Sequence, residues 1–191
     1  MEHEFAFVNR KGRKSLNVQV ACNDRWEFIN VYAHWPGSTH DSFILKQSHL
    51  WRVFESGAQG GLLLGDSGYP LRPWLILPFS NPATRPERHF NYGQTRARCL
   101  IEQVIGQLKR RFRPLLVGLR VSPERAQLVI VACVVLHNIA KQRSQPDSFE
   151  DSPVQPTQDE SGNSGSYCPS DFSEIASGKV VRDQIVNMYF T

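Results

Sequence analysis

The sequence predicts a domain of the mixed α/β class, in which a sheet is covered by helices. Two stretches, residues 15–22 and 26–33, alternate apolar and polar side chains as half-buried strands do. Farther along, residues 95–112 place apolar side chains at helical spacing, and residues 122–143 form a long apolar stretch that opens with a helix-start signal. Strand pairs that alternate with helices are typical of a mixed sheet packed against helices.

The first elements are predicted by turn and capping signals. The pair Asn23-Asp24 stands between the two alternating stretches, so together they predict an antiparallel hairpin. After it, Thr39 can cap a helix that runs to about Glu55. Asp41 falls in the first turn of that helix, where a negative charge is favourable near the positive end of the helix dipole.

Two short apolar runs and one long helical region follow. Residues 62–64 and 74–78 predict buried strands, because short apolar runs bounded by glycine or proline are typical of such strands. Thr84 and Glu87 match a capping box, which predicts a helical region starting there, with an interruption near Gly93. The last long stretch, residues 122–143, is apolar through its middle, so we expect that helix to be buried.

Charge and composition change at residue 143. Residues 1–143 contain 20 Lys+Arg and 10 Asp+Glu, a net charge of +10, whereas residues 144–191 contain 2 and 8, a net charge of −6. We expect one basic domain over 1–143. Residues 144–171 are rich in Ser, Pro, Gln, Asp and Gly and predict a disordered acidic linker, and residues 172–191 regain the apolar spacing of a short helix. The basic domain favours a polyanionic partner, nucleic acid first and acidic membrane surfaces second.

Cysteine usage and hydropathy narrow the class of protein further. The four cysteines are far apart and form no CxxC pair, so neither a zinc knuckle nor a disulfide framework is indicated. The longest apolar run, residues 128–136, is far shorter than the roughly 20 residues that span a bilayer. We therefore expect a soluble protein of an intracellular, reducing compartment, with no membrane partner.

Two carboxylates could carry chemistry. Asp66 stands in GDSGYP, directly after the apolar run 62–64, where either a simple turn or a catalytic carboxylate at a strand end explains it. Glu102 lies on the predicted helix, with Arg98 four residues before it and Gly106 four residues after it. Glycine within a helix costs about 1 kcal/mol relative to alanine, which suggests a close approach beside Glu102. The alternative is a solvated Glu102 that pairs with Arg98.

Basic residues surround Glu102 on this helix and beyond it, with no second acid among them: Arg96, Arg98, Lys109, Arg110, Arg111, Arg113 and Arg120. A solvated helix face usually mixes the two signs of charge. Phosphates attract clustered cations through charge and counterion release, and arginine adds bidentate contacts to phosphate oxygens. The cluster predicts a surface for the nucleic-acid backbone, with a merely basic exterior as the alternative.

Carboxylates beside such a surface suggest a magnesium site, because Mg²⁺ prefers oxygen ligands and often combines carboxylates with substrate phosphate. A two-metal site normally needs a third carboxylate. Asp41 is the nearest candidate by type, but its place at a helix start explains it at least as well, and neither Asp24 nor Asp41 is an expected replacement. The pair His137-Asn138, on the apolar last helix, is more typical of a hydrogen-bonded core pair than of a catalytic one.

Several long motifs occur together in one order: FVNRKGRKSLNVQVACND, HWPGSTHDSFIL, LLGDSGYPLRPWLILP, TRARCLIEQVIGQLKRRFRPL and ACVVLHNIA. They resemble the nuclease domain of the PIF/Harbinger transposases and their domesticated vertebrate relatives, over about residues 5–143. The resemblance implies a ribonuclease-H-like α/β fold, a mixed sheet flanked by helices, for a partial DDE transposase-derived nuclease domain at 1–143. It also implies a DDE triad that holds Mg²⁺ or Mn²⁺.

Within this resemblance, Asp66 matches the aspartate of the family's GDxGY motif and Glu102 matches its glutamate, so both are expected catalytic metal ligands. The family's first aspartate lies in a D-(G/C)-T-H motif upstream of NRKG, and no such motif is present in this sequence. We therefore expect an N-terminally truncated domain that lacks the first strand and its aspartate. The family also implies DNA as a partner, a Myb-like protein that assists nuclear import, and localisation in the nucleus and cytoplasm.

Three functions compete at this point. The first is a metal-dependent nuclease that cleaves DNA phosphodiester bonds through Asp66 and Glu102. The second is a catalytically dead domesticated transposase scaffold that binds DNA or protein, since two carboxylates rarely complete a two-metal site. The third is an unrelated mixed α/β domain, which the number of ordered motifs disfavours.

Overall fold

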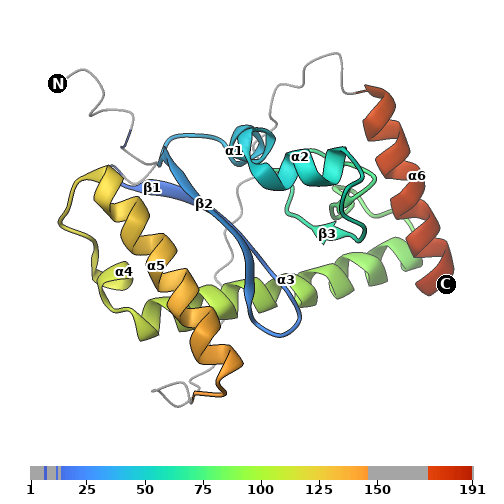
Figure 1. The fold of residues 1–191 in the computed structure, drawn as a ribbon. Coiled ribbons are helices and arrows are strands. Elements are labelled where there is room, and N and C mark those ends of the chain that lie inside the picture. The colour runs from blue at the N-terminus through green and yellow to red at the C-terminus, as the bar shows by residue number, and fades with distance from the viewer. Residues whose placement is uncertain (1–6, 8–11, 13, 146–171, 191) are drawn as a thin grey trace. The chain divides into compact units, whose positions relative to one another are not determined.

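A computed structural model of the 191-residue chain describes residues 7, 12, 14–145 and 172–190. The described chain divides into two compact units. The hairpin unit comprises residues 1–40 and 100–156, and the Asp66 unit comprises residues 41–99 and 157–191. Figure 1 shows the elements along the chain and labels all of them except β4 (Leu75–Ile76). The expected linker, residues 144–171, falls almost wholly outside the described residues, and the expected domain boundaries stay a prediction.

The hairpin unit begins with two antiparallel strands, β1 (Leu16–Cys22) and β2 (Phe28–Pro36). The hairpin was expected, but its second strand starts two residues later than the alternation predicts. Trp26 adopts a positive φ of 65°, which is uncommon for a bulky residue, so the turn extends through it. The Asn23 side chain stabilises this wider turn by accepting hydrogen bonds from the backbone N–H groups of Arg25 and Glu27.

Helices cover the hairpin within the same unit: the C-terminal part of α3 (Arg85–Arg111), the short α4 (Pro114–Val117) and α5 (Pro123–Gln142). Helix α5 lies along β2 (Figure 1). Asn138 joins the two, because its side-chain amide accepts from the Phe28 N–H at 2.9 Å and donates to the Phe28 carbonyl at 2.8 Å. His137 is fully buried with its ring edge against Phe28. The pair His137-Asn138 is thus a core pair, as the sequence indicated.

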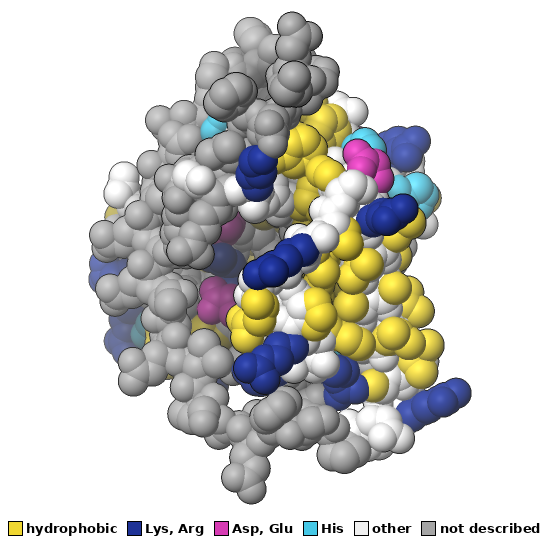
Figure 2. Space-filling view, turned by 90° about the vertical axis from the view of Figure 1, so that its left-hand side faces the viewer, with side chains coloured by type: hydrophobic (Ala, Val, Ile, Leu, Met, Phe, Trp, Pro, Cys, Tyr) yellow, Lys and Arg dark blue, Asp and Glu magenta, His cyan; other side chains and the backbone are white. Residues whose placement is uncertain are grey.

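Helix α5 is buried on one side only, so the expectation of a buried helix is wrong. Its buried side includes Cys133 and Val134, which pack with Phe28, Val104 and Leu108 in the core of the hairpin unit. Its other side exposes large apolar side chains, with the following residues at least one-third exposed: Leu128, Val131, Val135, Leu136 and Ile139. Figure 2, which views the side on which Figure 1 draws α5, shows hydrophobic side chains gathered over one broad region with Lys and Arg around them.

The Asp66 unit starts with two short helices, α1 (Asp41–Gln47) and α2 (His49–Glu55). The sequence predicts one helix here, and Ser48 divides it. The Ser48 backbone is extended, and its hydroxyl accepts from the Trp51 N–H as an N-cap while it donates to the Leu45 carbonyl. A serine that satisfies both helix ends therefore ends α1 and starts α2.

Strands β3 (Leu63–Leu64) and β4 (Leu75–Ile76) pair in parallel within the Asp66 unit. Strand β4 is buried as expected, but Leu64 is 47% exposed, so the prediction of a buried strand at 62–64 is wrong for β3. The expected single mixed sheet is also absent from the described residues, which form two separate two-stranded sheets. The α/β class is confirmed in this coarser form.

Helix α3 starts at the predicted capping box. Glu87 donates its backbone N–H to the Thr84 hydroxyl, and the Glu87 carboxylate accepts from the backbone N–H groups of Ala83 and Thr84. The helix continues through Gly93 without the expected interruption. A Cβ at Gly93 would lie 3.3 Å from the Phe190 ring, so this glycine allows the close approach of the C-terminal residues.

The last element, α6 (Phe172–Tyr189), lies in the segment that the sequence predicts to be a short helix. Val186 packs with Ile76 and Phe90 in a buried cluster of the Asp66 unit. A Cβ at Gly178 would lie 2.9 Å from the Arg72 carbonyl carbon, so the helix backbone needs glycine at this approach. None of the helices in the described part of the chain is long and apolar enough to cross a membrane.

Candidate metal and nucleic-acid site

Asp66 stands on a turn that follows β3 directly. The turn is held on both sides, because the Gly65 N–H donates to the Ile76 carbonyl and the Tyr69 N–H donates to the Asp66 carbonyl. The side chain takes part as well: Oδ1 of Asp66 accepts from the Gly68 N–H at 2.9 Å. This is an Asx turn, which a short carboxylate forms readily with the backbone two residues on. The turn explanation for GDSGYP is therefore confirmed, and it fixes one carboxylate oxygen.

Helix α3 supports this turn through a buried glutamine. The Gln94 side-chain amide donates to the Gly65 carbonyl at 3.1 Å and to the Ile76 carbonyl at 3.0 Å. Gln94 is 4% exposed, so both hydrogen bonds are shielded from water. These two hydrogen bonds hold α3 at the ends of β3 and β4. One of them is made to Gly65, the residue that precedes Asp66.

Arg98, one helical turn after Gln94, provides the counter-charge of Asp66. Nη2 of Arg98 lies 3.5 Å from Oδ2 of Asp66, and the two side chains are 35% and 37% exposed. Both groups are therefore reachable from solvent. The sequence placed Arg98 among the residues that hold the nucleic-acid backbone and offered Glu102 as its alternative partner. The structure brings Arg98 together with Asp66.

Two further groups lie at this turn: Asp41, which the sequence offered as the nearest third carboxylate but did not favour, and Tyr69, whose side chain sequence reasoning had not considered. A Cβ at Gly68 would lie 3.1 Å from Oδ1 of Asp66 and 3.8 Å from Oδ2 of Asp41, so both carboxylates border this glycine. Burial raises the pKa of the Tyr69 phenol, Asp41 and Asp66 raise it further, and Arg98 lowers it. Tyr69 is thus a neutral hydroxyl beside two carboxylates. The sequence signal for Asp41 was its residue type, but its position at the start of a helix explained this aspartate at least as well.

Glu102 lies on the exposed surface of α3, one helical turn after Arg98. It belongs to the hairpin unit, whereas Asp66 belongs to the other unit, so the pairing of the two as metal ligands stays a prediction. A Cβ at Gly106 would meet the Arg110 guanidinium at 3.4 Å, which is an ordinary contact with a flexible side chain. The described residues therefore give no close backbone approach beside Glu102.

The predicted backbone-binding residues lie on both units. In the Asp66 unit, Arg96 is exposed and lies over the Tyr92 ring at 5.9 Å, beside the Arg98 already paired with Asp66. In the hairpin unit, Lys109 and Arg113 are exposed, and Arg110 and Arg111 are half-buried. Each of these cations reaches solvent, as contact with a phosphate backbone requires.

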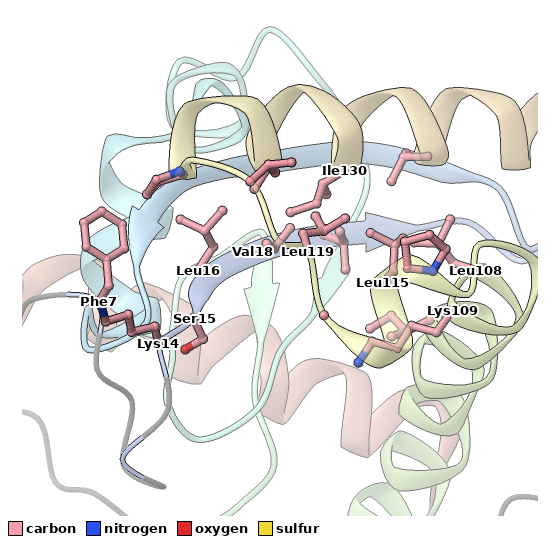
Figure 3. Close-up of a pocket in the computed structure, with 18 residues that line it drawn as sticks. Phe7, Lys14, Ser15, Leu16, Val18, Leu108, Lys109, Leu115, Leu119 and Ile130 are labelled. Carbon is pink, nitrogen blue, oxygen red and sulfur yellow. The ribbon is translucent and has the colours of Figure 1, made fainter. Parts of the chain in front are cut away.

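The hairpin unit also contains a large apolar cavity of about 1160 Å³. Figure 3 shows side chains of β1, α4 and α5 converging on it, among them Leu16, Val18, Leu115 and Ile130. None of the described residues that line this cavity is acidic, so they offer no carboxylate ligand for a metal ion. Among the described residues, the candidate carboxylate ligands therefore lie outside this cavity.

The metal-binding capacity of the described residues is limited. No group of three His, Cys, Asp or Glu side chains that could hold a metal ion occurs among them. The turn at Asp66 offers the carboxylates of Asp66 and Asp41 near one point, which is an oxygen donor set of the type that hard divalent cations prefer. A cation, the Arg98 guanidinium, already faces one of these oxygens. The residues present fit part of a divalent-metal site.

Sequence comparison defines the class of protein. The family model described as "DDE superfamily endonuclease" matches residues 1–138, so the chain belongs to this endonuclease family. The resemblance to the Harbinger transposase-derived nucleases is confirmed.

Named relatives make the likeness more specific. The chain is 40% identical over 141 residues to the human protein "Putative nuclease HARBI1", a match that covers 72% of this chain and 40% of the human protein. It is 34% identical over 143 residues to the Xenopus laevis protein of the same name, covering 73% and 41% of the two chains. It is 31% identical over 142 residues to "Protein ALP1-like" of Arabidopsis thaliana, a match that covers 65% of this chain and 35% of the Arabidopsis protein. The chain thus spans about two-fifths of the length of the curated relatives, and no solved structure matches it significantly.

Proposed function

We propose that this chain is part of a divalent-metal-dependent nuclease that cleaves DNA phosphodiester bonds, with Asp66 and Glu102 as catalytic metal ligands. The observation that carries the proposal is the way in which the Asp66 carboxylate is held and exposed. Its carboxylate is held on a strand-end turn through Oδ1, is partly exposed, and has a cation opposite Oδ2. The family description and the names of the vertebrate relatives support nuclease activity.

Mg²⁺ or Mn²⁺ would suit the oxygen ligands, because both are hard cations. When bound, such a metal supplies an activated water or hydroxyl and stabilises the leaving oxygen. The chain itself positions Asp66 through the Asx turn and through Gln94, which holds the preceding residue. Glu102 is proposed as a ligand on the strength of its family motif. A ribonuclease-H-like arrangement of the complete domain belongs to the same proposal.

The basic residues have a separate role in the proposal. Arg96, Lys109, Arg110, Arg111 and Arg113 hold the phosphate backbone, and each reaches solvent. Because every neutralised phosphate releases counterions, binding weakens as salt rises, with a logarithmic slope of about −0.9 per phosphate on duplex DNA. Arginine is favoured at such contacts because its planar group binds two phosphate oxygens at once.

The test compares DNA cleavage by the purified chain and by two variants across a titration of Mg²⁺ or Mn²⁺. Asp66→Asn keeps the shape of the side chain and its Asx turn but removes the charge that a metal needs, so cleavage should be lost. Asp24→Asn is the matched control, because Asp24 is an exposed aspartate in the hairpin turn. Equal cleavage by the parent and Asp66→Asn would remove Asp66 from the mechanism, and the same comparison with Glu102→Gln tests the second ligand.

The competing scaffold function is not favoured, because the family description and the relatives' names both indicate a nuclease. Two further parts of the proposal concern the cell. We propose that the protein occurs in the nucleus and cytoplasm and that a Myb-like protein assists its nuclear import. Imaging a tagged chain with and without such a partner tests this, and equal nuclear fractions would contradict it.

A further inference from the structure

We propose that the short helix α4 is a wedge that inserts the side chains of Leu116 and Val117 between base pairs of DNA and bends the duplex. The α4 corner, residues 113–118, joins the end of α3 to the segment that precedes α5 (Figure 1). The inference rests on the part of the proposed function in which this chain binds DNA. It does not require that the chain cleaves DNA.

The first observation is that the corner presents two branched apolar side chains to solvent. Leu116 is 63% exposed and Val117 is 74% exposed. Their neighbours face the protein instead, since Leu115 packs against the core of the hairpin unit and Leu119 lines the apolar cavity (Figure 3). The hydrophobic effect favours burial of all four side chains, so the exposed pair lacks the partner that apolar side chains usually have.

The second observation is that local hydrogen bonds hold the corner in one shape. The N–H groups of Leu116 and Val117 donate to the Arg113 carbonyl at 2.9 and 3.1 Å, and the Gly118 N–H donates to the carbonyl of the first helical residue, Pro114, at 2.9 Å. Gly118 ends the helix with a φ of 114°, a conformation that favours glycine. A tip that is ordered before binding loses less conformational entropy on insertion than a flexible one.

The third observation is the charge around the corner, which identifies the occupant. Arg113 lies directly before α4 and Arg120 lies shortly after it, and both side chains are exposed. Between Glu102 and Glu124 the sequence contains five Lys or Arg and no Asp or Glu. Proteins that bend DNA combine such cations, which contact phosphates, with an apolar side chain such as leucine that enters a base step from the minor groove.

An acidic lipid surface is the other polyanion that a basic corner with an apolar tip attracts. Helix α4 has only four residues, whereas the helices that bind membrane interfaces bury a long apolar face. The endonuclease family of the chain also favours a nucleic acid. DNA is therefore the occupant to which the inference commits.

Insertion has two consequences for the bound duplex. It unstacks one base step, so binding is favoured where that step is already weakened, as at a mismatch or at a flexible TA step. It also bends the duplex, by roughly 20–90° in proteins that use such wedges. The wedge thus gives the chain a preference for deformable DNA without hydrogen bonds to base edges.

The test measures binding of the full chain to a duplex of about 30 base pairs by fluorescence anisotropy, and bending by energy transfer between dyes at the two ends of the duplex. EDTA is present, so that metal-dependent cleavage does not interfere. The parent should bend the duplex and bind one with a central mismatch roughly tenfold more tightly than the fully paired one. The double variant Leu116→Ala/Val117→Ala should bind the two duplexes equally and leave them straight.

Two variants control for lost apolar surface and lost charge. Leu128→Ala makes the same truncation at an exposed leucine of the same unit, on α5, and should bend DNA like the parent. Arg113→Gln should lower the slope of log affinity against log salt by about 0.9, the effect of one lost phosphate contact, while the double variant at the tip should keep the parental slope. Circular dichroism of each variant establishes that the folded chain is being compared.

The inference is overturned if the parent leaves the duplex straight, or if the double variant bends DNA and prefers the mismatch as the parent does. Vesicles of phosphatidylserine and phosphatidylcholine test the other polyanion. If the double variant loses vesicle binding but keeps parental DNA bending, the tip contacts lipid and the inference is wrong.

The cleavage assay with Asp66→Asn distinguishes failure of the wedge from failure of the proposed nuclease. If the parent bends DNA in the expected way but Asp66→Asn cleaves as well as the parent, the role of Asp66 fails and the wedge stands. If cleavage depends on Asp66 but the double variant bends DNA like the parent, only the wedge fails. A parent that binds no DNA would contradict both proposals.

Discussion

Replacing Gln94 by leucine should destabilise the chain by about 2 kcal/mol. The substitution removes the hydrogen bonds to the carbonyls of Gly65 and Ile76 while keeping most of the side-chain volume. The Ile76 carbonyl still accepts a hydrogen bond from the Gly65 N–H, so it loses only one of its two hydrogen bonds. The buried Gly65 carbonyl loses the partner it has in the structure, which costs about 1–3 kcal/mol for an unsatisfied buried group. Because Oε1 of Gln94 has no hydrogen-bond partner among the described residues, its removal costs little.

Thermal unfolding followed by circular dichroism measures this effect. For a chain of this length, about 2 kcal/mol corresponds to a decrease in Tm of about 4–8 °C. Gln103→Leu is the control, since Gln103 is exposed on the same helix, and exposed substitutions usually change stability by less than about 0.5 kcal/mol. Equal Tm values for the Gln94 and Gln103 variants would show that the amide does not hold the turn before Asp66.

Two other predictions test the helix start and the two sides of α5. Hydrogen bonds from the backbone N–H groups of Thr84 and Ala83 lower the pKa of the Glu87 carboxyl in the folded chain. The ionised carboxylate therefore stabilises the fold at pH values above the pKa that Glu87 has in the unfolded chain. This stabilisation is lost as the pH falls through the lower pKa of the folded chain. Glu87→Gln should therefore lower the urea midpoint at pH 7 and differ less from the parent at pH 3; a difference that stays constant with pH would contradict the charge-based cap. Val134→Ala should cost about 2 kcal/mol through lost burial and a cavity, whereas Val135→Ala should cost less than about 0.5 kcal/mol because Val135 is exposed. Urea unfolding of both variants measures this, and equal costs would mean that the outer side of α5 is covered in solution.

The predictions that succeeded depend on neighbours in the sequence. The capping box joins Thr84 to Glu87, and the Asx turn joins Asp66 to Gly68, so residue type and spacing are sufficient to predict them. The hairpin follows from alternation on both sides of a turn signal. The start of its second strand was missed, because the positive φ of Trp26 is not the usual state of a bulky residue.

The predictions that failed concern burial, which depends on what packs against an element. Apolar composition predicted that α5 is buried, yet only the side that faces the hairpin is covered, and Leu128 is 73% exposed. The same reasoning predicted a buried strand at 62–64, where Leu64 is largely exposed. A sequence shows which side chains favour burial, but it does not show whether enough partners are present to bury them.

By itself, the sequence determined the α/β class, the endonuclease family, the turn that presents Asp66 and the basic character of the domain. These properties depend on local spacing, on ordered motifs and on summed charge. Only the tertiary structure decided that Arg98 is the partner of Asp66, and that Asp41 borders the same turn. Those contacts join residues far apart in the chain. The contact of Arg98 depends on Gln94, which holds α3 at the ends of β3 and β4 through hydrogen bonds between distant residues that residue type and spacing do not predict.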